Sequence, residues 1–155
     1  MKHVHSFMTD IGRIHVAEED GAITNVMLPG GKAPPGTFAS TPLLEKAAVQ
    51  ISEYLQGRRQ KFTVPLAPQG SDFAMKVWKE MLDIPYGKVR TYGEMAVAIG
   101  RPGAARAVGQ ACNRNPISIL IPCHRVVGAG GKLTGYAGGL DLKERLLRLE
   151  KDALL

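Results

Sequence analysis

Residues 91–111 read TYGEMAVAIGRPGAARAVGQA, and this stretch decides the fold of the second half of the chain. Thr91 and Glu94 have the spacing of a capping box, in which the threonine hydroxyl accepts from the Glu94 amide and the glutamate accepts from the Thr91 amide. The helix that they open is expected to end at the Arg-Pro-Gly turn of residues 101–103, and residues 104–111 are expected to form a second helix. Two short helices joined by such a turn are typical of the helix-turn-helix motif that binds DNA, although ordinary helical corners share the pattern.

The second of these helices has mostly small side chains and a single long cationic one, Arg106. Small side chains would let its backbone approach a nucleic acid closely, with Arg106 reaching into the base stack. The alternative is tight packing of the alanines against another helix, with Arg106 in solvent. The other residues that we expect to face DNA are Ala104, Ala105, Ala107, Gly109 and Gln110.

The positive charge of the chain is concentrated around this motif. The net charge is +6, and residues 86–132 hold seven Lys and Arg but a single acidic residue, Glu94. Residues 1–70, in contrast, hold seven basic and six acidic side chains. A basic stretch that lacks acidic residues favours a surface that faces phosphate groups.

The composition is that of a folded protein with free thiols. The chain has 155 residues, of which 45% are hydrophobic, and only two cysteines. We find no secretory signal pattern and no apolar run of the roughly 20 residues that a membrane helix needs. We therefore expect a soluble protein of one or two small domains in a reducing compartment, the cytoplasm or, in a eukaryote, the nucleus.

The first half reads as a small antiparallel sheet with one helix. Short alternating runs lie within residues 3–28, and Asp20-Gly21 is a strong hairpin signal because both central positions of a type I′ turn need a positive φ. Thr41 is expected to cap a helix that continues to Gly57. Prolines and a glycine in residues 64–70 mark a linker, so we divide the chain into residues 1–67 and 68–155.

Cys123 lies in the sequence IPCHRVVG of residues 121–128, after the apolar run 117–121. We expect that run to be a buried strand from which Cys123 emerges. A free cysteine has a pKa of about 8.5, so a nucleophilic role needs a base or a cation nearby. His124 is adjacent and is a candidate base, directly or through water, and Glu150 is one candidate for the carboxylate that would orient the imidazole.

Other uses of this thiol fit the sequence less well. A zinc site needs about four ligands in closely spaced pairs, and only His124 and Cys112 are near Cys123 in the chain, so we expect no metal. Inert packing is common for a buried cysteine, and it suits Cys112 on the small-residue helix better than Cys123 in its basic surroundings.

Several of these residues together resemble the O6-alkylguanine-DNA alkyltransferases, a family of DNA repair proteins. The resemblance rests on residues 121–126, on Arg106 to Gly109 and Asn115-Pro116 before them, and on Gly135 to Leu140 after them. It is dense from about Phe73 to Glu150 and weaker in the first half. It implies an α+β fold, with a ribonuclease H-like α/β domain in residues 1–67 and a mainly helical, winged-helix-like domain with the helix-turn-helix in residues 68–155.

The resemblance also implies a chemistry in which the protein is consumed. Cys123 would take the alkyl group from O6-alkylguanine in duplex DNA and keep it, without a cofactor, and O4-alkylthymine is a second candidate substrate. His124 with water would accept the thiol proton, Glu150 would orient His124, and Asn115 would brace the turn beside the cysteine.

The expected partner is double-stranded DNA, bound through the minor groove by a monomer with no membrane association. Arg106 would fill the gap left by a flipped guanine, which Tyr92 would help to rotate and would bind at N3. Arg125 is a further predicted DNA contact. The expected guanine pocket comprises Tyr92, Val126, Tyr136, Ala137 and Gly138.

Two departures from the family pattern affect the adducts that would be accepted. Ala137 stands where some members have serine, and Ser118 where some have proline.

Three rival functions remain: a non-catalytic alkyltransferase-like lesion binder, which would lack the acceptor thiol, a transcription regulator and a cysteine hydrolase. Cys123 argues against the first, and no sensor domain or oxyanion-hole motif supports the others.

Overall fold

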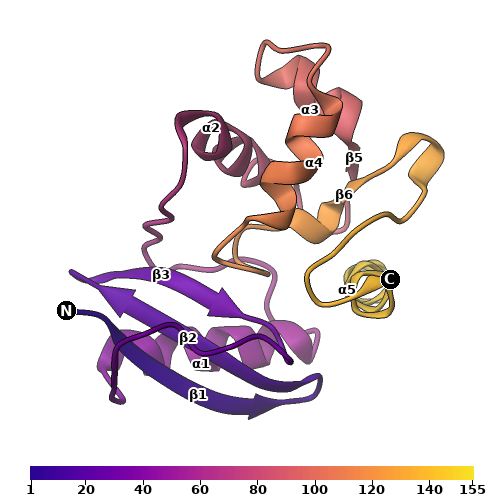
Figure 1. The fold of residues 1–155 in the computed structure, drawn as a ribbon. Coiled ribbons are helices and arrows are strands. Elements are labelled where there is room, and N and C mark those ends of the chain that lie inside the picture. Colours follow the sequence, from indigo (N-terminus) through magenta and orange to yellow (C-terminus); the bar gives the residue numbers. More distant parts are fainter. The chain divides into compact units, whose positions relative to one another are not determined.

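The alternating runs of the first half form a four-stranded sheet, seen in the computed structural model, which describes all 155 residues. Strands β1 (His3–Thr9), β2 (Gly12–Glu19) and β3 (Ala22–Met27) are antiparallel neighbours, and the short β4 (Thr37–Phe38) adds parallel to β1, giving the order β3-β2-β1-β4 (Figure 1). Asp20 and Gly21 turn the chain from β2 to β3 with φ of 52° and 79°. The predicted hairpin is therefore confirmed, with both central residues in the left-handed region.

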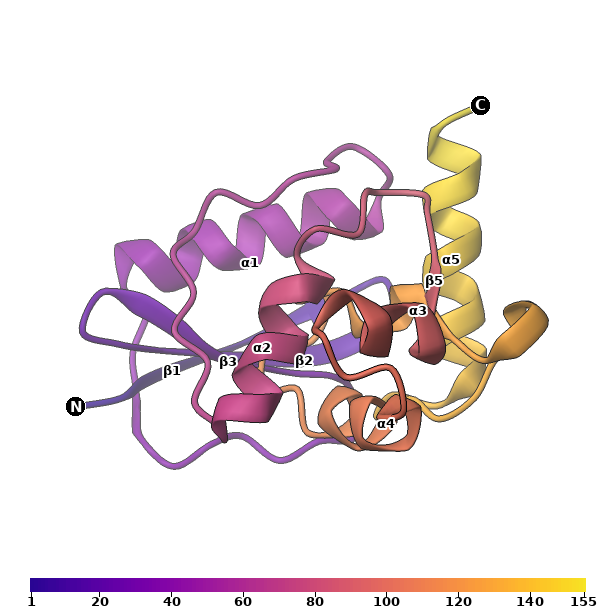
Figure 2. The same cartoon turned by 90° about the horizontal axis from the view of Figure 1, so that it is seen from above.

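Helix α1 (Pro42–Leu55) covers one face of this sheet (Figure 2). The Thr41 hydroxyl accepts from the Leu44 amide at 3.2 Å, and Pro42 occupies the first turn, where its missing amide costs nothing. Leu44, Ile51 and Tyr54 are fully buried on the face turned to the strands. The cap and the apolar spacing thus determine both where the helix starts and which side packs.

The outer edge of β3 is closed by two segments that come from distant parts of the chain. The Ile23 amide donates to Pro65 O at 2.8 Å, and the Val26 amide donates to Pro116 O at 2.9 Å. Packing divides the chain into unit 1, residues 1–69 with 116–120, and unit 2, residues 70–115 with 121–155. Residues 116–120 pack in unit 1 because their backbone pairs with β3, although the sequence division places them in the second half.

Residues 117–121 are buried, as expected, but the predicted strand is wrong. Ile117 makes only an isolated bridge to Val26, and the chain then turns sharply. The Leu120 amide donates to Ser118 O at 2.9 Å, which leaves Ile119 between them at a φ of 73°. A β-branched residue rarely adopts this conformation, so the local backbone is strained and held by its surroundings.

Unit 2 is mainly helical. Its elements are α2 (Asp72–Met81), β5 (Arg90–Thr91), α3 (Tyr92–Ala98), α4 (Ala105–Asn113), η1 (Cys123–Arg125), β6 (Val126–Val127), η2 (Ala129–Gly131) and α5 (Leu140–Ala153). The capping box is confirmed: the Glu94 amide donates to Thr91 Oγ1 at 3.0 Å, and the Thr91 amide donates to Glu94 Oε1 at 2.8 Å. Helices α3 and α4 pack against each other around the turn, as the helix-turn-helix pattern predicts. The two units confirm the mixed α+β class, and none of the helices has the length and apolar character of a membrane span.

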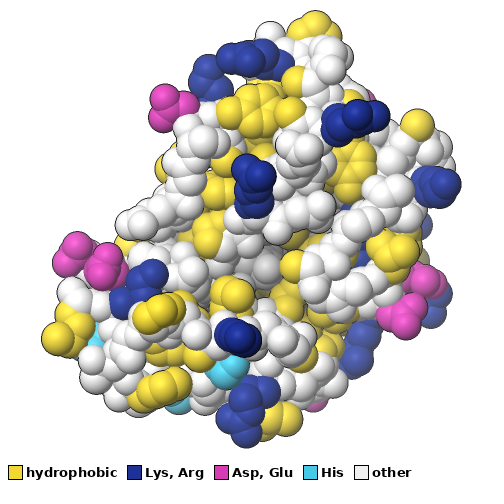
Figure 3. Space-filling view, in the orientation of Figure 1, with side chains coloured by type: hydrophobic (Ala, Val, Ile, Leu, Met, Phe, Trp, Pro, Cys, Tyr) yellow, Lys and Arg dark blue, Asp and Glu magenta, His cyan; other side chains and the backbone are white.

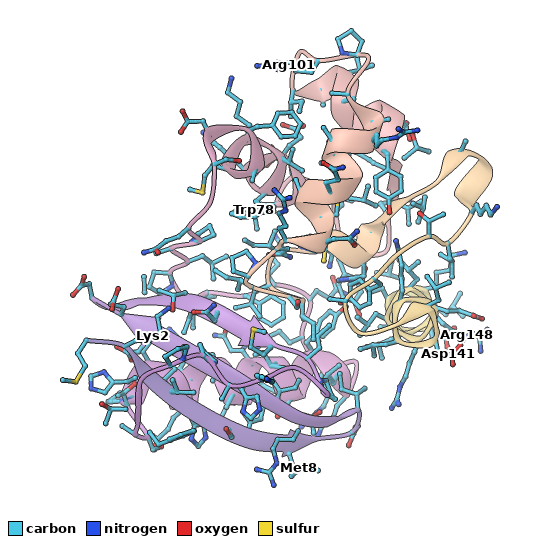
Figure 4. The ribbon with its side chains drawn as sticks, in the orientation of Figure 1. Lys2, Met8, Trp78, Arg101, Asp141 and Arg148 are labelled. Atoms are coloured by element: carbon cyan, nitrogen blue, oxygen red, sulfur yellow. The ribbon has the colours of Figure 1, made fainter.

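Trp78 fixes α4 to α2, so replacing it should destabilise unit 2. Its side chain points from α2 toward α4 (Figure 4), is 2% exposed, and donates from Nε1 to Ala111 O at 2.9 Å. Trp78→Phe removes this hydrogen bond and part of the buried ring. We expect the free energy of unfolding to fall by about 1–3 kcal/mol, measured by urea denaturation followed by circular dichroism. Met75→Leu, at a partly exposed position on the same helix, is the control and should unfold like the parent; a Trp78→Phe variant as stable as the control would contradict this role.

Candidate active site

Cys123 is the first residue of η1, and two successive turns bring the chain to it. Pro122, with φ −82° and ψ 65°, has the conformation of an inverse γ-turn, closed by the Cys123 amide, which donates to Ile121 O at 2.8 Å. The cysteine is 5% exposed. The thiol therefore projects from a compact turn rather than from the end of a strand.

Asn115 braces this turn from the other side. Its Nδ2 donates to Ile121 O at 2.8 Å, so the chain just after α4 is tied to the residue two positions before Cys123. The Asn115 side chain also hydrogen-bonds to Cys123 and favours its thiolate. The structure thus places Asn115 where the sequence expects it, between the helix pair and the thiol.

The surroundings of the Cys123 sulfur act in opposite directions. Burial raises the pKa of Cys123 above its ordinary value, while the Asn115 side chain, the Lys143 charge and the backbone amides of Cys123 and His124 lower it. Burial dominates, so the resting group is a protonated thiol. The hydrogen-bond donors are nevertheless in place to hold a thiolate once a base has removed the proton.

His124 and Glu150 are brought together from η1 and α5, 26 residues apart in the chain, and both are fully buried. Nε2 of His124 lies 2.7 Å from Glu150 Oε2. Burial lowers the pKa of His124, with the Glu150 carboxylate acting against that shift, so the imidazole is neutral near pH 7. The contact is consequently a hydrogen bond rather than an ion pair: Nε2–H donates to the carboxylate, and Nδ1 is left as the basic nitrogen.

The Glu150 carboxylate has two further partners. Arg125 donates from Nε to Oε1 at 2.9 Å and from Nη2 to Oε2 at 3.0 Å, and the Gly87 amide donates to Oε1 at 2.9 Å. Gly87 has a φ of 80°, which favours glycine at this turn. A buried carboxylate is tolerated because a cation and an amide compensate for the water that it has lost.

The position of Arg125 in the structure argues against the predicted contact between this residue and DNA. Its side chain is buried, its Nη1 donates to Ile84 O at 2.8 Å, and its guanidinium lies 5.6 Å from the centre of the Tyr86 ring. All three nitrogens are engaged within unit 2. The physical reason is that the carboxylate of Glu150 needs a cation, and Arg125 supplies it.

Tyr92 stands at the start of α3 beside the loop that precedes α5. Its hydroxyl donates to Thr134 O at 3.3 Å and accepts from Thr134 Oγ1 at 3.1 Å. Burial raises the pKa of Tyr92, so the phenol keeps its proton and remains a donor. Gly109 on α4 faces this ring, since a Cβ there would lie 3.7 Å from Tyr92 Cε1.

The other predicted pocket residues lie around the same centre. Val126 is fully buried and pairs with Arg90 between β6 and β5. The Tyr136 ring stands edge-on to His124, with ring centres 6.5 Å apart, and burial holds its pKa well above the usual range. Ala137 and Gly138 lie in a loop closed by the Gly139 amide, which donates to Tyr136 O at 2.9 Å.

The predicted DNA-facing residues lie on α4 and at its N-terminus. Arg106 and Gln110 are exposed one turn apart, and Lys and Arg side chains lie around the α3–α4 region in Figure 3. Ala104, Ala105, Ala107 and Gly109 are half-buried. Asn113 is also exposed, one turn after Gln110 on the same face of α4, and its spacing of three residues from Gln110 makes it a further candidate for a DNA contact.

The two cysteines differ sharply in their surroundings. Burial raises the pKa of Cys112 to about 12, with the Cys123 charge adding to the shift and only Lys143 and a backbone hydrogen bond opposing it. Cys112 therefore stays a thiol at any physiological pH. The structure contains no group of three or more His, Cys, Asp or Glu side chains arranged to hold a metal ion.

The buried neutral His124 makes stability depend on pH. Its pKa in the folded protein lies below the unfolded value of 6.5, so as the pH falls through 6.5 the unfolded chain binds a proton that the folded chain does not. We expect this group to remove up to about 1.4 kcal/mol of stability per pH unit between pH 6.5 and 5. Urea denaturation at a series of pH values measures how the free energy of unfolding changes with pH in the parent and in His124→Gln. The slope for His124→Gln should be smaller, by up to the contribution of one bound proton. Identical slopes would show that His124 is not held neutral by the fold.

Known proteins of one family match this chain over nearly its whole length. Residues 72–152 match the family described as 6-O-methylguanine DNA methyltransferase, DNA binding domain, and residues 2–68 match its ribonuclease-like domain. Proteins called methylated-DNA--protein-cysteine methyltransferase are 48% identical over 148 residues in Methanosarcina barkeri and 45% identical over 154 residues in Mycobacterium tuberculosis, covering 93% and 97% of this chain and 94% and 93% of those proteins.

Solved structures agree with these matches in both sequence and fold. The crystal structure of Mycobacterium tuberculosis O6-methylguanine methyltransferase covers 99% of this chain and 94% of that one, with a TM-score of 0.90 and 43% identity. The structure of Mycobacterium tuberculosis OGT in complex with DNA gives the same TM-score and identity, over 97% and 94% of the two chains. The chain therefore belongs to the 6-O-methylguanine DNA methyltransferase family.

Proposed function

We propose that this protein repairs DNA by transferring the alkyl group of O6-alkylguanine to Cys123, irreversibly and once per molecule. The observation that carries the proposal is a nearly buried thiol between thiolate-stabilising donors and a histidine oriented by a buried carboxylate. Relatives at 45–48% identity are named for this transfer to a protein cysteine, and a structural neighbour is solved in complex with DNA. These relatives favour transfer over the non-catalytic lesion binder.

The helix pair is the part that we assign to duplex DNA, in the minor groove. Small, half-buried residues cover much of α4 and its N-terminus, and they would let the helix backbone come close to the floor of a groove. They are Ala104, Ala105, Ala107 and Gly109. Arg106 is exposed and extends from this side, so it can enter the gap that a flipped guanine leaves. The flipped base would then meet Tyr92, whose phenol is a hydrogen-bond donor near the thiol.

The reaction is an in-line displacement at the alkyl carbon. The base takes the proton from the Cys123 thiol, the sulfur forms a bond to the carbon, and the bond between that carbon and O6 breaks with its electron pair remaining on guanine. His124 accepts the thiol proton through water, and the Tyr92 phenol at N3 stabilises the departing guanine. A neutral imidazole is the form required for the first step, and the buried Glu150 maintains its orientation.

The pocket for the flipped guanine is assigned to the loop before α5 and to β6. The fully buried Val126 and the half-buried Tyr136 ring supply the walls, and Ala137 and Gly138 supply backbone groups without bulky side chains. No group in the site can cleave the resulting thioether, so repair ends with the alkylated protein. One chain contains every residue assigned here, so we propose that the protein acts as a monomer. We place its activity in the reducing cytoplasm, where chromosomal DNA and a free thiol are both found.

Transfer to Cys123 is tested by weighing the intact protein. After incubation with a duplex that contains one O6-methylguanine, we expect each molecule to gain one methyl group, located on Cys123 by peptide mapping. Cys123→Ser should show no gain, whereas Cys112→Ser should gain the methyl group like the parent, because Cys112 stays a thiol. DNA binding without any mass change would reject transfer and favour a lesion binder, and turnover without modification would point to a hydrolase.

The role of Arg106 is tested by comparing two substrates. Arg106→Ala should lower the rate of repair in duplex DNA about tenfold or more, since an inserted side chain offsets part of the few kcal/mol of stacking lost on flipping. The rate with free O6-benzylguanine, which needs no flipping, should stay near that of the parent. Arg58→Ala in unit 1 removes the same charge at another exposed site and is the control. Equal losses of Arg106→Ala on both substrates would remove the proposed insertion.

A further inference from the structure

Arg101 is an exposed cation held in a defined position at the turn between α3 and α4. The turn is closed by the Ala104 amide, which donates to Arg101 O at 2.9 Å. The guanidinium lies over the ring of Phe73, in the first turn of α2, at 5.9 Å from the ring centre. Figure 4 shows Arg101 beside the loop that joins α3 and α4. An aromatic ring attracts a guanidinium at this distance, so it restricts a side chain that otherwise samples many rotamers.

The guanidinium of Arg101 has no polar partner within the protein. Arg101 belongs to none of the ion pairs of the structure, and its side chain donates no hydrogen bond. Asp72 directly precedes Phe73 in the chain, yet it makes no ion pair with Arg101. Stacking uses the flat face of a guanidinium and leaves the N–H groups along its edge available. These groups match two oxygens of one phosphate, so Arg101 is prepared for an anion that the protein itself does not supply.

Arg101 also lies in the part of unit 2 that we assign to DNA. The turn leads directly into α4, and Arg106 is exposed in the first turn of that helix, five residues after Arg101. The only acidic residue of the stretch 86–132 is Glu94, whose carboxylate accepts from the Thr91 amide in the capping box. In a helix-turn-helix the first helix crosses the nucleic-acid backbone, so a duplex that receives Arg106 would bring phosphates to this turn.

We propose that Arg101, held over Phe73, binds a phosphate of the DNA backbone and fixes the duplex on the helix pair while Arg106 enters the base stack. The proposal rests on the proposed DNA repair function and adds a second kind of contact to it. Arg101 positions the duplex without reading its bases, because every nucleotide carries the same phosphate. Phe73 is a positioning residue that acts through Arg101.

The charge of Arg101 is tested by the salt dependence of binding to undamaged duplex DNA, measured by fluorescence anisotropy with the full chain. Each phosphate that a protein cation neutralises adds about 0.9 to the slope of log K against log salt. Arg101→Gln should therefore reduce this slope by about 0.9 and weaken binding about tenfold near 0.1 M salt. Arg101→Lys keeps the charge and should keep the slope.

Arg148→Gln is the matched control, because it removes an exposed arginine of unit 2 from α5, away from the helix pair (Figure 4). It should bind DNA with the slope and affinity of the parent. An unchanged slope in Arg101→Gln, or the same reduction in Arg148→Gln, would overturn the phosphate contact.

The role of Phe73 is tested by Phe73→Leu, which removes the aromatic face but keeps an apolar side chain and the charge of Arg101. We expect an unchanged slope and an affinity about two- to fivefold lower, the range of a cation–π contact at an exposed site. The double variant Phe73→Leu/Arg101→Gln should bind no more weakly than Arg101→Gln alone. Losses that add would reject the action of Phe73 through Arg101. Should Phe73→Leu fail to fold, the slope of Arg101→Gln still decides.

Undamaged DNA keeps this test separate from the transfer function. A parent that loses slope in Arg101→Gln but gains no methyl group from an O6-methylguanine duplex would reject transfer and support the phosphate contact. A parent that gains the methyl group, with the same slope in Arg101→Gln, would support transfer and overturn the phosphate contact.

Discussion

The carboxylate of Glu150 is the group on which the arrangement of the site depends. It is fully buried and holds three partners from separate parts of the chain: the imidazole of His124, the guanidinium of Arg125 and the amide of Gly87. Removing one member of a buried charged pair typically costs about 3–5 kcal/mol, because the other is left without compensation. The same contacts therefore anchor α5, fix the histidine tautomer and hold the turn that carries the thiol.

Environment, rather than residue type, separates the two thiols of this protein. Both are nearly buried, yet Cys112 lies within a helix among apolar neighbours, and burial raises its pKa to about 12. Cys123 lies at the start of a short turn, where the Asn115 side chain, the charge of Lys143 and two backbone amides lower the pKa of its thiol against the effect of burial. A reactive cysteine thus needs prepared donors for its anion as well as a base for its proton.

Local signals predicted much of this fold and part of its site. The capping box at Thr91, the cap at Thr41 and the Asp20-Gly21 turn act within a few residues, and the structure has all three. The run 117–121 has the composition of a strand, but pairing with β3 and the turn at Ile119 override that propensity. Arg125 and Lys143 could not be assigned from the sequence, because their partners are distant in the chain; the only hint was that Lys143, Leu146 and Glu150 share one face of their helix.

The edge of β3 bears on how the chain is made. Ile23 donates its amide to Pro65 O and accepts from the Ala67 amide, and the Val26 amide donates to Pro116 O, which the ribosome adds nearly fifty residues after the linker. Until residues 116–120 have been added, the Val26 end of this edge lacks its partner, and an open strand edge can pair with another chain. The segment that closes the edge leads directly into Pro122 and Cys123, so the nascent protein completes its first sheet and delivers its reactive thiol within the same few residues of synthesis.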